Sequence, residues 1–528
     1  MTNAFNECSR DSFLSRCRSD LPELFSWVQW SYCCIGELRF GSHRIASSTG
    51  VQQGDPLGPL LFSLVLIDFL SSVTFPAGLA FQLWYLDDGT LLDTRSSLAS
   101  FLQILVQRGP SFGLYPNLSK CEVFWPSGNQ SFPSSVTRIS LLQEEGAAFL
   151  GSPVWGSSDY FLSFVGKAVD KVASLQDRLG GLGNPQVELH LLRSCLGVCK
   201  LNHLLRTISP NCVISQLERF DYNLRSALGR ICKSSISDLS WLQATLPCSM
   251  GGLGLREATS TSSAAFLGSC FSSQELCYRL LQSFSGGPDV FPSIPDQDVA
   301  TSILLPLINS DSLPDLIHPA CGQRVFQHEL DIARQTLLLN SLTIRDQARI
   351  RSISADPCTS SWLRAIPCDS LGLSMSSQEF VCSLRYWLGV PLFSATSPVR
   401  CPCGSVVDQF GDHLLGCGHG PMRIRRHDAL CDVIYHALLQ DNTGCRKEQR
   451  CACSQLDRPG DVFHPDFVHG KPAYFDVTVR CPLQESLLGR SAVSAGVAAA
   501  KGEEDKDAHH DELVQAAGAC CLAVLCGS

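Results

Sequence analysis

Two adjacent aspartates between two apolar segments are the feature that most limits how this chain can fold. Residues 81–92 read Phe-Gln-Leu-Trp-Tyr-Leu-Asp-Asp-Gly-Thr-Leu-Leu, with Asp87 and Asp88 at the centre. The flanks are typical of short β-strands, and Asp-Asp-Gly is typical of the turn between them. No basic residue lies beside these carboxylates, so a hard divalent cation is their natural neutraliser. The pattern predicts a hairpin with a metal site at its tip; an ordinary Asp-Gly turn is the alternative.

A glycine- and proline-rich loop precedes this hairpin and runs into an apolar helix. Residues 50–59 read Gly-Val-Gln-Gln-Gly-Asp-Pro-Leu-Gly-Pro. Asp55 can cap the helix and Pro56 suits its first turn, while Gly54 allows a backbone or a nucleic-acid strand to approach closely. Followed by Tyr85-x-Asp-Asp, this loop resembles the reverse transcriptases of non-LTR retrotransposons. The resemblance implies that Asp87 binds Mg²⁺ directly, that Asp88 supports it, and that Gln53, Gly54 and Tyr85 contact the substrate.

The first residues resemble the end of another motif of that family, in which an aspartate precedes an aromatic residue by five positions. Asn3-Ala4-Phe5-Asn6 matches the second half, with Phe5 as the aromatic under the sugar of the incoming nucleotide. Counting back from Phe5 places the metal-binding aspartate just before Met1. We therefore expect an incomplete two-metal site, and no RNA-templated DNA synthesis by the chain as given.

Two further blocks complete the resemblance to a polymerase palm. Residues 113–122 resemble the family's G-L-x-x-N-x-x-K-C block, which implies that Lys120 contacts the outgoing phosphates. Taken alone, Lys120 is more often a solvated surface lysine. Residues 149–154, Phe-Leu-Gly-Ser-Pro-Val, resemble the turn that grips the primer end, with Leu150 and Gly151 at its centre. The palm should end near residue 156.

Periodicity outlines the elements between and after these motifs. Apolar spacing predicts helices over 11–35 and 97–108, and residues 38–45 are typical of a strand. Residues 157–282 form the predicted helical thumb, and Pro247 to Leu255 resembles a P-x-x-x-G-G-L-G-L block found there in the family. A Pro/Ser/Gly-rich linker then leads into a helical connector over 283–395.

Composition limits the class of protein. The 528 residues carry a net charge of −9, so any basic surface for nucleic acid must be local. There are 27 cysteines but no signal peptide, which favours reduced thiols, a few of them on metal, over a disulfide framework. The sequence predicts a soluble, intracellular protein without a membrane contact. The resemblance implies a nuclear location, with an RNA template and a DNA primer or target as partners.

A cysteine–histidine cluster predicts a zinc site over residues 396–430. Cys401, Cys403, His413 and Cys417 have the spacing C-x-C-x9-H-x3-C, and three thiolates with one imidazole can close a tetrahedral Zn²⁺ site. Coincidence in a cysteine-rich chain is the alternative. The segment resembles the knuckle that precedes the endonuclease in site-specific non-LTR elements. The rival histidine donors are His419 and His427. The basic residues proposed as phosphate contacts are Arg423, Arg425, Arg426, His427, Arg446, Lys447 and Arg450.

A second set of carboxylates follows in residues 431–528. Glu448 is placed near the end of a predicted helix, and Asp461 and Asp476 lie on two predicted strands with a turn near His469 and Gly470. This layout is that of a restriction-type endonuclease core, in which the two aspartates hold a divalent metal that activates water. We expect them side by side on a small sheet flanked by helices. Surface polar residues are the alternative.

The endonuclease resemblance is imperfect in one respect. The fold normally has a lysine two residues after the second acidic residue, where this chain has Thr478. A lysine on the next helix would have to replace it. The candidates are Lys501 and Lys506, of which Lys501 is preferred.

Together the patterns predict an α+β multidomain protein. It would contain an incomplete right-hand polymerase palm (1–156), a helical thumb (157–282), a helical connector (283–395), a zinc knuckle (396–430) and a small α/β endonuclease-like domain (431–528). The predicted function is a fragment of a retrotransposon-encoded RNA-directed DNA polymerase. A non-enzymatic, zinc-dependent nucleic-acid-binding protein and a decayed gene copy are the alternatives.

Overall fold

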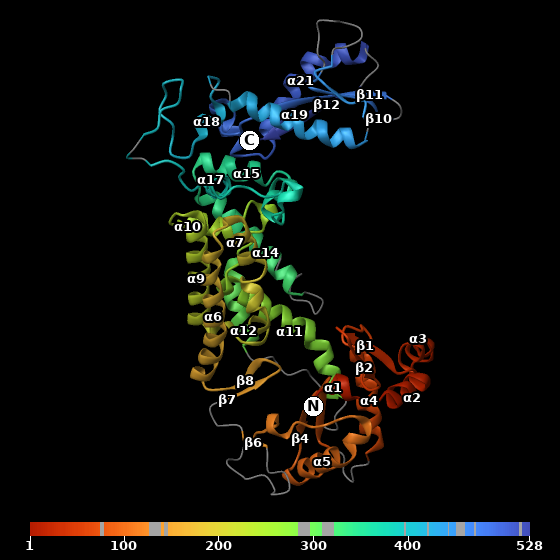
Figure 1. The fold of residues 1–528 in the computed structure, drawn as a ribbon. Helices are drawn as coiled ribbons and strands as arrows, with labels where there is room; N and C mark the ends of the chain where they lie inside the picture. Colours follow the sequence, from red (N-terminus) through yellow and green to blue (C-terminus); the bar gives the residue numbers. More distant parts are fainter. Residues whose placement is uncertain are drawn as a thin grey trace. The chain divides into compact units, whose positions relative to one another are not determined.

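A computed structural model gives the fold of the chain (Figure 1). Two compact units follow from the contacts, Met1–Ala148 with Leu276–Pro292, and Phe149–Glu275 with Ser293–Ser528. The residues that the structure describes are 1–73, 79–125, 139–141, 146–282, 296–308, 322–394, 396, 398–419, 422–441, 443–449, 460–468, 471–516 and 520–527. No helix in these ranges is long and apolar enough to cross a membrane.

The first unit packs helices and short hairpins around the apolar helix α4. Phe62 and Phe69 on α4 are fully buried, together with Phe13 of α2 and Phe101 of α5. Burial of four such rings dominates the energetics of a small core. The elements are α1 (Ala4–Glu7), α2 (Arg10–Asp20), α3 (Pro22–Tyr32), β1 (Gly36–Phe40), β2 (His43–Ser47), α4 (Gly58–Ser72), β3 (Phe81–Tyr85), β4 (Asp88–Leu92), α5 (Arg95–Arg108), β5 (Glu122–Val123), β6 (Ser140–Leu141) and β7 (Gly146–Phe149).

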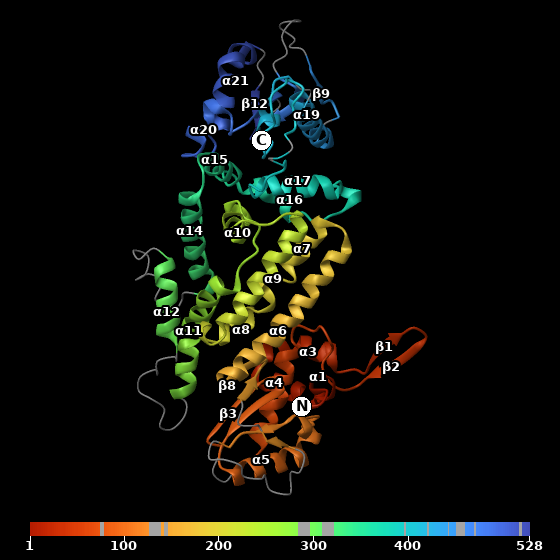
Figure 2. The same ribbon diagram turned by 90° about the vertical axis from the view of Figure 1, so that its left-hand side faces the viewer.

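Two sequence predictions in this unit are wrong in detail. The helix expected over 11–35 is two helices, because Pro22 starts α3 and pushes Leu21 out of helical geometry, to φ −139° and ψ 59°. The strand expected over 38–45 is a hairpin, β1–β2, in which Phe40 pairs with His43. Gly41 makes that turn possible with a φ of 60°. Figure 2 shows this hairpin extending away from α1 and α3. The helix predicted over 97–108 is confirmed as α5.

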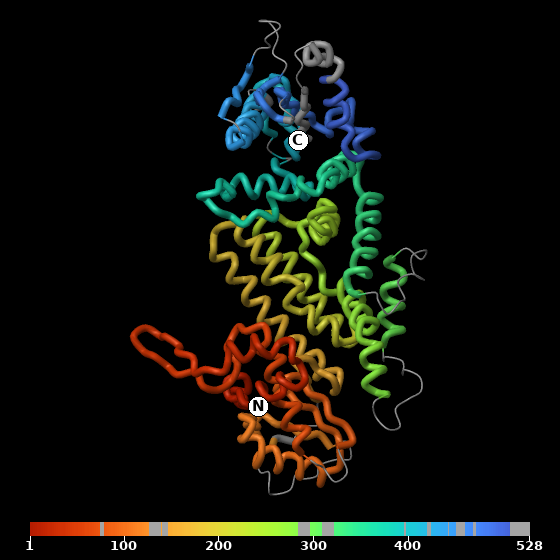
Figure 3. Tube along the Cα trace, turned by 90° about the vertical axis from the view of Figure 1, so that its right-hand side faces the viewer, coloured from red at the N-terminus to blue at the C-terminus, as the bar shows by residue number. Residues whose placement is uncertain are grey.

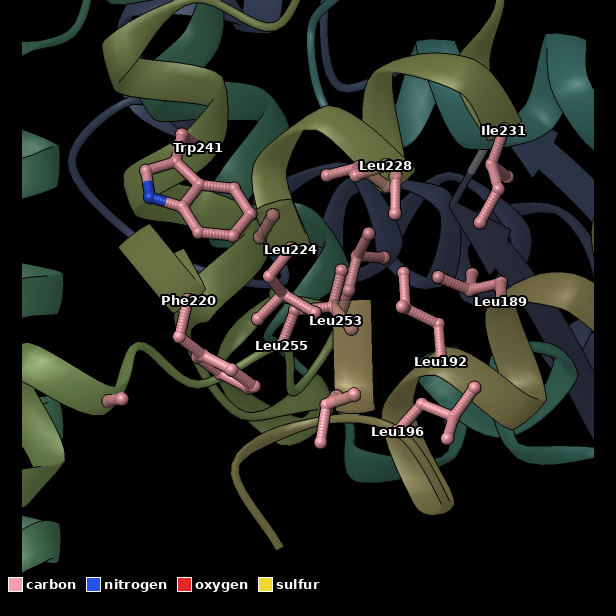
Figure 4. Packing of buried hydrophobic residues seen from close by; sticks show 14 of the residues in the cluster. Leu189, Leu192, Leu196, Phe220, Leu224, Leu228, Ile231, Trp241, Leu253 and Leu255 are labelled. Carbon is pink, nitrogen blue, oxygen red and sulfur yellow. The ribbon is translucent and has the colours of Figure 1, made fainter. Parts of the chain in front are cut away.

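The second unit begins with a helical bundle over the residues for which a helical thumb and a helical connector are predicted. Its core brings Phe220, Leu224 and Leu253 together with Phe380 and Trp387 of the connector, and Figure 4 shows the thumb side of this packing. The elements are β8 (Ser152–Gly156), α6 (Ser158–Leu179), α7 (Pro185–Ser194), α8 (Asn202–Thr207), α9 (Ile214–Cys232), α10 (Asp238–Thr245), α11 (Ala258–Gln282), α12 (Gln297–Leu304), α14 (Gln323–Ser341), α15 (Ile344–Ile353), α16 (Ser361–Arg364) and α17 (Ser377–Trp387).

A buried arginine also links thumb and connector. Arg349 of α15 donates to Gln243 Oε1 of α10 at 3.0 Å and to Asp346 Oδ1 at 2.9 Å, and it also donates to the carbonyl of Trp387. Gln243 in turn donates to the carbonyls of Gly251 and Trp387, both at 2.8 Å. A buried charge of this kind must be paired and hydrogen-bonded to be tolerated. Thumb and connector therefore form one folded body rather than two.

The start of α11 depends on a buried carboxylate from another helix. Asp221 of α9 accepts hydrogen bonds from the amides of Ala258 (2.6 Å) and Thr259 (3.1 Å) and from the Thr259 hydroxyl (2.5 Å). These are donors that the first turn of a helix leaves unsatisfied. Burial nevertheless raises the pKa of Asp221 to about 7.

The glycine-rich block before α11 has a structural role. Leu253 and Leu255 are buried, and their amides donate to the carbonyl of Ala244. A Cβ at Gly252 would lie 2.0 Å from the carbonyl oxygen of Leu246, so the backbone passes too close for any side chain.

The C-terminal part of this unit is a four-stranded sheet with helices packed against it (Figure 1). The strand order is β12-β11-β10-β9, with β11 and β12 parallel and the other pairs antiparallel. Helix α19 contacts β10 and β11, and α21 contacts β11 and β12. The elements are α18 (Asp412–Gly416), α19 (Met422–Asp441), β9 (Arg446–Lys447), β10 (Val462–Val468), β11 (Lys471–Arg480), α20 (Glu485–Ser491), α21 (Val497–Ala516) and β12 (Cys520–Gly527).

Candidate metal centres

The predicted hairpin is present, but its turn lies one position earlier than expected. Tyr85 pairs with Asp88, so Leu86 and Asp87 form the two-residue loop and Asp88 begins β4. Leu86 has a φ of 55°, a left-handed conformation that is unfavourable for a residue with a branched side chain. Backbone strain of this kind concentrates at functional sites.

Both carboxylates of the hairpin are accessible. The side chain of Asp87 is 38% exposed, and Asp88 is also exposed. The α-amino group of Met1 lies 4.0 Å from Asp87 Oδ2 and donates to the Asp87 carbonyl at 3.4 Å. Within the described part of the chain, no side chain donates a hydrogen bond to either carboxylate. The donor set is therefore two exposed hard oxygen ligands, which fits a Mg²⁺ site.

Cross-strand packing fixes the hairpin that carries these carboxylates. Trp84 pairs with Gly89, where a Cβ would lie 2.4 Å from the indole ring. The same ring packs on Phe101 of α5, with 6.2 Å between ring centroids. Gly89 is thus required because the indole occupies the space of its missing side chain.

The segment around Phe5 lies directly on the Gly50 loop. Val51 donates to the carbonyl of Phe5 at 2.7 Å, and Gln53 donates to the side-chain oxygen of Asn6 at 3.2 Å. Gly50 has a φ of 68°, and a Cβ there would lie 2.2 Å from the carbonyl oxygen of Asn6. Two motifs that are far apart in sequence therefore share one backbone contact that only glycine permits.

Asp55 organises this loop but does not cap α4, which corrects the sequence prediction. The helix begins at Gly58, with Pro59 rather than Pro56 in its first turn. Asp55 Oδ1 accepts from the amide of Leu57 at 2.8 Å, and its other oxygen accepts from the hydroxyl of Tyr32. Burial, with a contribution from Asp55, raises the pKa of Tyr32 to about 12.

Arg10 holds the other end of the loop. Its guanidinium donates to the carbonyls of Gly50 (3.0 Å), Ser47 (2.7 Å) and Thr49 (3.2 Å), and it lies over the Tyr32 ring. Gly54 is exposed, has a φ of 91°, and has no atom within 4 Å of a built Cβ. The loop is therefore anchored at its base and open at Gln53 and Gly54, where a ligand would approach.

Lys120 is exposed on a short 3-10 helix, Leu118–Lys120. Within the described ranges, no hydrogen bond or ion pair joins it to Asp87 or Asp88. Its block is nevertheless anchored near the first residues of the chain, because Thr2 donates to the carbonyl of Tyr115 at 2.7 Å. A Cβ at Gly113 would lie 1.9 Å from the carbonyl oxygen of Glu7.

The expected primer-gripping segment forms a tight turn. Leu150 and Gly151 have φ values of 47° and 81°, as a two-residue loop between strands requires. His203 of α8 contacts the carbonyl of Leu150 at 3.0 Å, and Ser152 shares a 2.6 Å hydrogen bond with Thr207. Helix α8 thus fixes the turn within the second unit.

The predicted zinc ligands converge on one point. One donor atom each from Cys401, Cys403, His413 and Cys417 lies within 4.8 Å of the others. Cys401 Sγ and Cys417 Sγ are 3.7 Å apart, and Cys403 Sγ and His413 Nε2 are 3.2 Å apart. With Zn–S near ~2.3 Å, the sulfur atoms of a tetrahedral site would be about 3.8 Å apart, so the donors fit zinc. His419 is exposed, and His427 lies in another cluster.

The knuckle backbone supports this donor set. Asp408 accepts from the amides of Phe410 (2.9 Å), Asp412 (3.1 Å) and His413 (2.7 Å), which fixes the turn before the histidine. Hydrogen bonds from Ser405 lower the pKa of Cys403 to about 6. The thiolate is the form that binds metal.

Asp461 and Asp476 lie side by side, as expected. Val462 pairs with Phe475, and continuing this antiparallel register places Asp461 opposite Asp476. Asp461 Oδ2 also accepts from the amide of Val477 at 2.7 Å. Burial raises the pKa of Asp476, and the nearby Asp461 carboxyl contributes to that rise. The turn residues His469 and Gly470 lie outside the described residues.

The structure favours Lys506 over Lys501. Lys506 Nζ lies 2.6 Å from Asp476 Oδ2. Lys501, the preferred candidate, instead pairs with Glu504 (3.2 Å) and Asp505 (3.0 Å) on its own helix. Both lysines are on α21, but they lie on different faces of it because five positions do not complete whole helical turns.

Glu448 does not approach from a helix, which corrects the prediction. Helix α19 ends at Asp441, and Glu448 follows the edge strand β9 with a φ of 50°. Its amide donates to the carbonyl of Asp461 at 2.8 Å, while its side chain is exposed. The intervening Gly444 was the sequence signal that the helix had ended.

His427 is the residue that sequence reasoning misplaced. It lies on α19, and its Nε2 is 3.2 Å from Asp461 Oδ2. Cys431, one turn later, lies beside it, and the three residues can bring one donor atom each within 4.8 Å. The i, i+4 spacing of His and Cys on an amphipathic helix was the available signal.

Only some of the basic residues proposed as phosphate contacts are free of other protein partners among the described residues. Arg426 donates to the carbonyl of Leu415 at 2.6 Å, and Lys447 forms an ion pair with Asp432. Arg425 and Arg446 are exposed. The side chain of Arg423 and the whole of Arg450 lie outside the described residues.

Comparisons with known proteins agree with the geometry of the first unit. Residues 7–154 match the family described as reverse transcriptase (RNA-dependent DNA polymerase). A similar protein is the retrotransposable element SLACS 132 kDa protein of Trypanosoma brucei gambiense, 27% identical over 270 residues. These comparisons support a reverse transcriptase of a retrotransposon. The similarity covers 48% of this chain and 22% of that protein, so the chain spans about a fifth of the length of its curated relative.

The reverse transcriptase match includes most of the residues that the sequence analysis selected for the polymerase site. Phe5 lies just before the matched segment. The zinc cluster and the Asp461 centre lie after it, in the second unit. The selected residues inside the reverse transcriptase segment are Gln53, Gly54, Tyr85, Asp87, Asp88, Lys120, Leu150 and Gly151.

Proposed function

We propose that the chain is part of a retrotransposon-encoded RNA-directed DNA polymerase that performs template-directed nucleotidyl transfer. One observation carries the proposal: three segments distant in sequence, including the Asp87 hairpin, meet residues 1–5. Phe5 is joined to Val51, Thr2 to Tyr115, and Met1 to Asp87, each by a backbone hydrogen bond. These are the segments whose residues resemble the motifs of polymerase palms.

In this proposal Asp87 and Asp88 hold Mg²⁺ at the hairpin tip. The ion neutralises phosphate charge and orients the attacking hydroxyl when it is bound. Phe5 stacks on Phe62 of α4 at 5.1 Å between centroids, which fixes the ring beside the open Gln53–Gly54 loop. Tyr85 is exposed next to the carboxylates and is positioned to contact the primer. Leu150 and Gly151 are proposed to grip the primer end, and Lys120 to contact outgoing phosphate.

Metal-directed cleavage of the backbone tests this assignment without requiring synthesis. Fe²⁺ replaces Mg²⁺ at hard oxygen sites. With ascorbate as reductant and added hydrogen peroxide as oxidant, the bound iron generates hydroxyl radicals that cut nearby peptide bonds. Cuts are expected near residues 5 and 85–90, and they should disappear when Mg²⁺ is added in excess. The double change Asp87→Asn and Asp88→Asn should abolish them.

Asp93→Asn is the matched control, because the Asp93 carboxylate accepts hydrogen bonds from the backbone amides of Ala80 and Thr94 and is not part of the proposed metal site. It should leave the cutting pattern unchanged. Cuts that persist in the Asp87/Asp88 double variant would refute the metal site.

We propose a second activity, cleavage of DNA by the C-terminal sheet, because Asp461, Asp476 and Lys506 converge there. Asp476 is buried while the side chain of Asp461 is 25% exposed, so the centre opens to solvent on the Asp461 side. The two carboxylates would hold a divalent cation that activates water. Lys506 would hold the buried Asp476 ionised and oriented.

A plasmid-nicking assay with Mg²⁺ or Mn²⁺ tests this second activity. Asp476→Asn and Lys506→Ala should each reduce nicking by about 100-fold or more, which is typical for the loss of a group that organises a metal centre. Lys501→Ala is the matched control on the same helix and should retain full nicking. Equal losses for the two lysine variants, or nicking that survives Asp476→Asn, would contradict the proposal.

A further inference from the structure

Three donor atoms of different chemistry meet on the open side of the Asp461 centre. His427 Nε2 lies 3.2 Å from Asp461 Oδ2 and 3.9 Å from Cys431 Sγ. The histidine and cysteine come from one face of α19, and the carboxylate comes from the residue before β10. A helix packed on a sheet thus brings together a nitrogen, a sulfur and an oxygen ligand.

The separation between the nitrogen and the oxygen matches an edge of a metal tetrahedron. With metal–nitrogen and metal–oxygen bonds near ~2.0–2.1 Å, the nitrogen-to-oxygen edge of a tetrahedral site is about 3.3 Å. With metal–sulfur near ~2.3 Å, the nitrogen-to-sulfur edge is about 3.6 Å. The observed 3.2 Å matches the nitrogen-to-oxygen edge. Cys431 Sγ lies 3.9 Å from Nε2 but 3.7 Å from Nδ1, so its side chain must turn toward the Nε2 side of the ring to share the metal.

A second carboxylate orients the imidazole for coordination. Asp428 Oδ1 lies 3.2 Å from His427 Nδ1, on the side of the ring opposite Asp461. With its proton on Nδ1 and donated to Asp428, the ring presents the Nε2 lone pair to Asp461. Carboxylate–histidine–metal arrangements use such a hydrogen bond to fix the tautomer of the ligand.

We infer that this centre binds a transition metal of the zinc class through His427, Cys431 and Asp461. A nitrogen, sulfur and oxygen donor set favours Zn²⁺ or Co²⁺ over Mg²⁺, which takes oxygen ligands. Three protein ligands leave a fourth position for water or a phosphate oxygen, as in catalytic zinc sites. The inference rests on the proposed nuclease centre and names its metal, and it adds two residues, His427 and Cys431, to that centre.

Metal titration of the full chain tests the site. Metal-free protein is titrated with Co²⁺ and then with Zn²⁺ in 10 mM Mg²⁺, and bound metal is counted after passage over a chelating resin. About two equivalents are expected, one in the knuckle and one at His427. His427→Gln and Cys431→Ser should each retain about one equivalent, and Cys403→Ser should retain the other. His436→Gln, on the same helix, is the matched control and should retain both.

The thiolate-to-Co²⁺ absorption separates the two sites even if a variant folds poorly. In the Cys403→Ser chain, the remaining band should have about one third of the knuckle's intensity, since one thiolate replaces three. One equivalent in the unaltered chain, or two in His427→Gln, would overturn the inference. Nicking is read separately: an unaltered chain that binds both metal ions but does not nick DNA would refute only the proposed activity.

Discussion

Arg345 of α15 donates two parallel hydrogen bonds to the Asp412 carboxylate, from Nε to Oδ2 and from Nη2 to Oδ1, each 2.7 Å long. Asp412 directly precedes the proposed zinc ligand His413, and the guanidinium also lies over the ring of Phe410 at 4.1 Å. The bidentate geometry fixes direction as well as distance. The connector helix therefore holds the knuckle in place from outside its donor set.

Replacing Arg345 with alanine should weaken zinc binding by about 10- to 100-fold, the usual effect of losing a group that orients a metal ligand. The loss follows because the backbone at His413 is then held by Asp408 alone. Competition with a chromophoric chelator measures the change. Arg364→Ala, which loses a single hydrogen bond to the carbonyl of Pro357, is the control and should match the unaltered chain. Equal zinc affinities for Arg345→Ala and the unaltered chain would contradict this role.

Cys403→Ser should remove one equivalent of zinc and loosen the segment from residue 398 to 419. A small knuckle takes its folding free energy from the metal, so hydrogen exchange there should rise sharply. Cys382→Ser, at an exposed cysteine of α17, should change neither zinc content nor exchange. Unchanged zinc in the Cys403 variant would remove that residue from the ligand set.

Comparing alanine substitutions at two glycines of one loop distinguishes the cost of backbone strain from the cost of a steric clash. Gly54→Ala should cost about 1 kcal/mol, because φ is positive but the space is open. Gly50→Ala combines the same strain with a Cβ only 2.2 Å from the Asn6 carbonyl oxygen, and should cost at least ~2 kcal/mol more. Thermal unfolding of the two variants measures the difference. Similar melting temperatures for the two variants would contradict the close approach of Gly50 to the carbonyl oxygen of Asn6.

The buried Asp221 should make the stability of the helical bundle fall as pH rises. Its folded pKa is raised to about 7, while an unfolded aspartate titrates near ~3.9. The protonated form is thus favoured in the folded state. Its contribution is complete below about pH 4 and is lost as pH rises through about 7, on the order of a few kcal/mol.

Asp221→Asn should flatten this pH dependence, which melting temperatures between pH 5 and pH 8 will show. Asp238→Asn is the control, because that side chain is 93% exposed and should leave the slope intact. A slope that Asp221→Asn leaves unchanged would place the pH dependence elsewhere.

Local sequence patterns predicted much of this fold, and the predictions that were wrong have physical explanations. Tyr85 and Asp88 were correctly assigned to a hairpin, because alternating apolar residues and turn residues are local signals. The turn position was missed, since Leu86 adopts a left-handed φ that its own side chain disfavours. Only the packing of Trp84 against Gly89 explains that register.

Contacts between distant elements were the hardest to predict. The convergence of the four proposed zinc donors was predicted from their spacing, because knuckle ligands lie close in sequence. His427 was instead offered as a rival zinc ligand, since nothing in the sequence shows that α19 packs against the start of β10. Lys506 and Lys501 could not be separated without the rotation of α21 relative to Asp476.

The core shared by thumb and connector has a consequence for any attempt to divide the protein. Leu224 and Leu253 are packed in the same cluster as Phe380 and Trp387, and Arg349 bonds to Gln243 across it. Figure 3 shows the trace of α14 leading into α15. Arg351 of α15 donates to the carbonyl of Ala492, directly after α20, at 2.9 Å. A chain split between residues 282 and 296 would therefore yield two halves that reassemble when co-expressed, whereas each half made alone would aggregate.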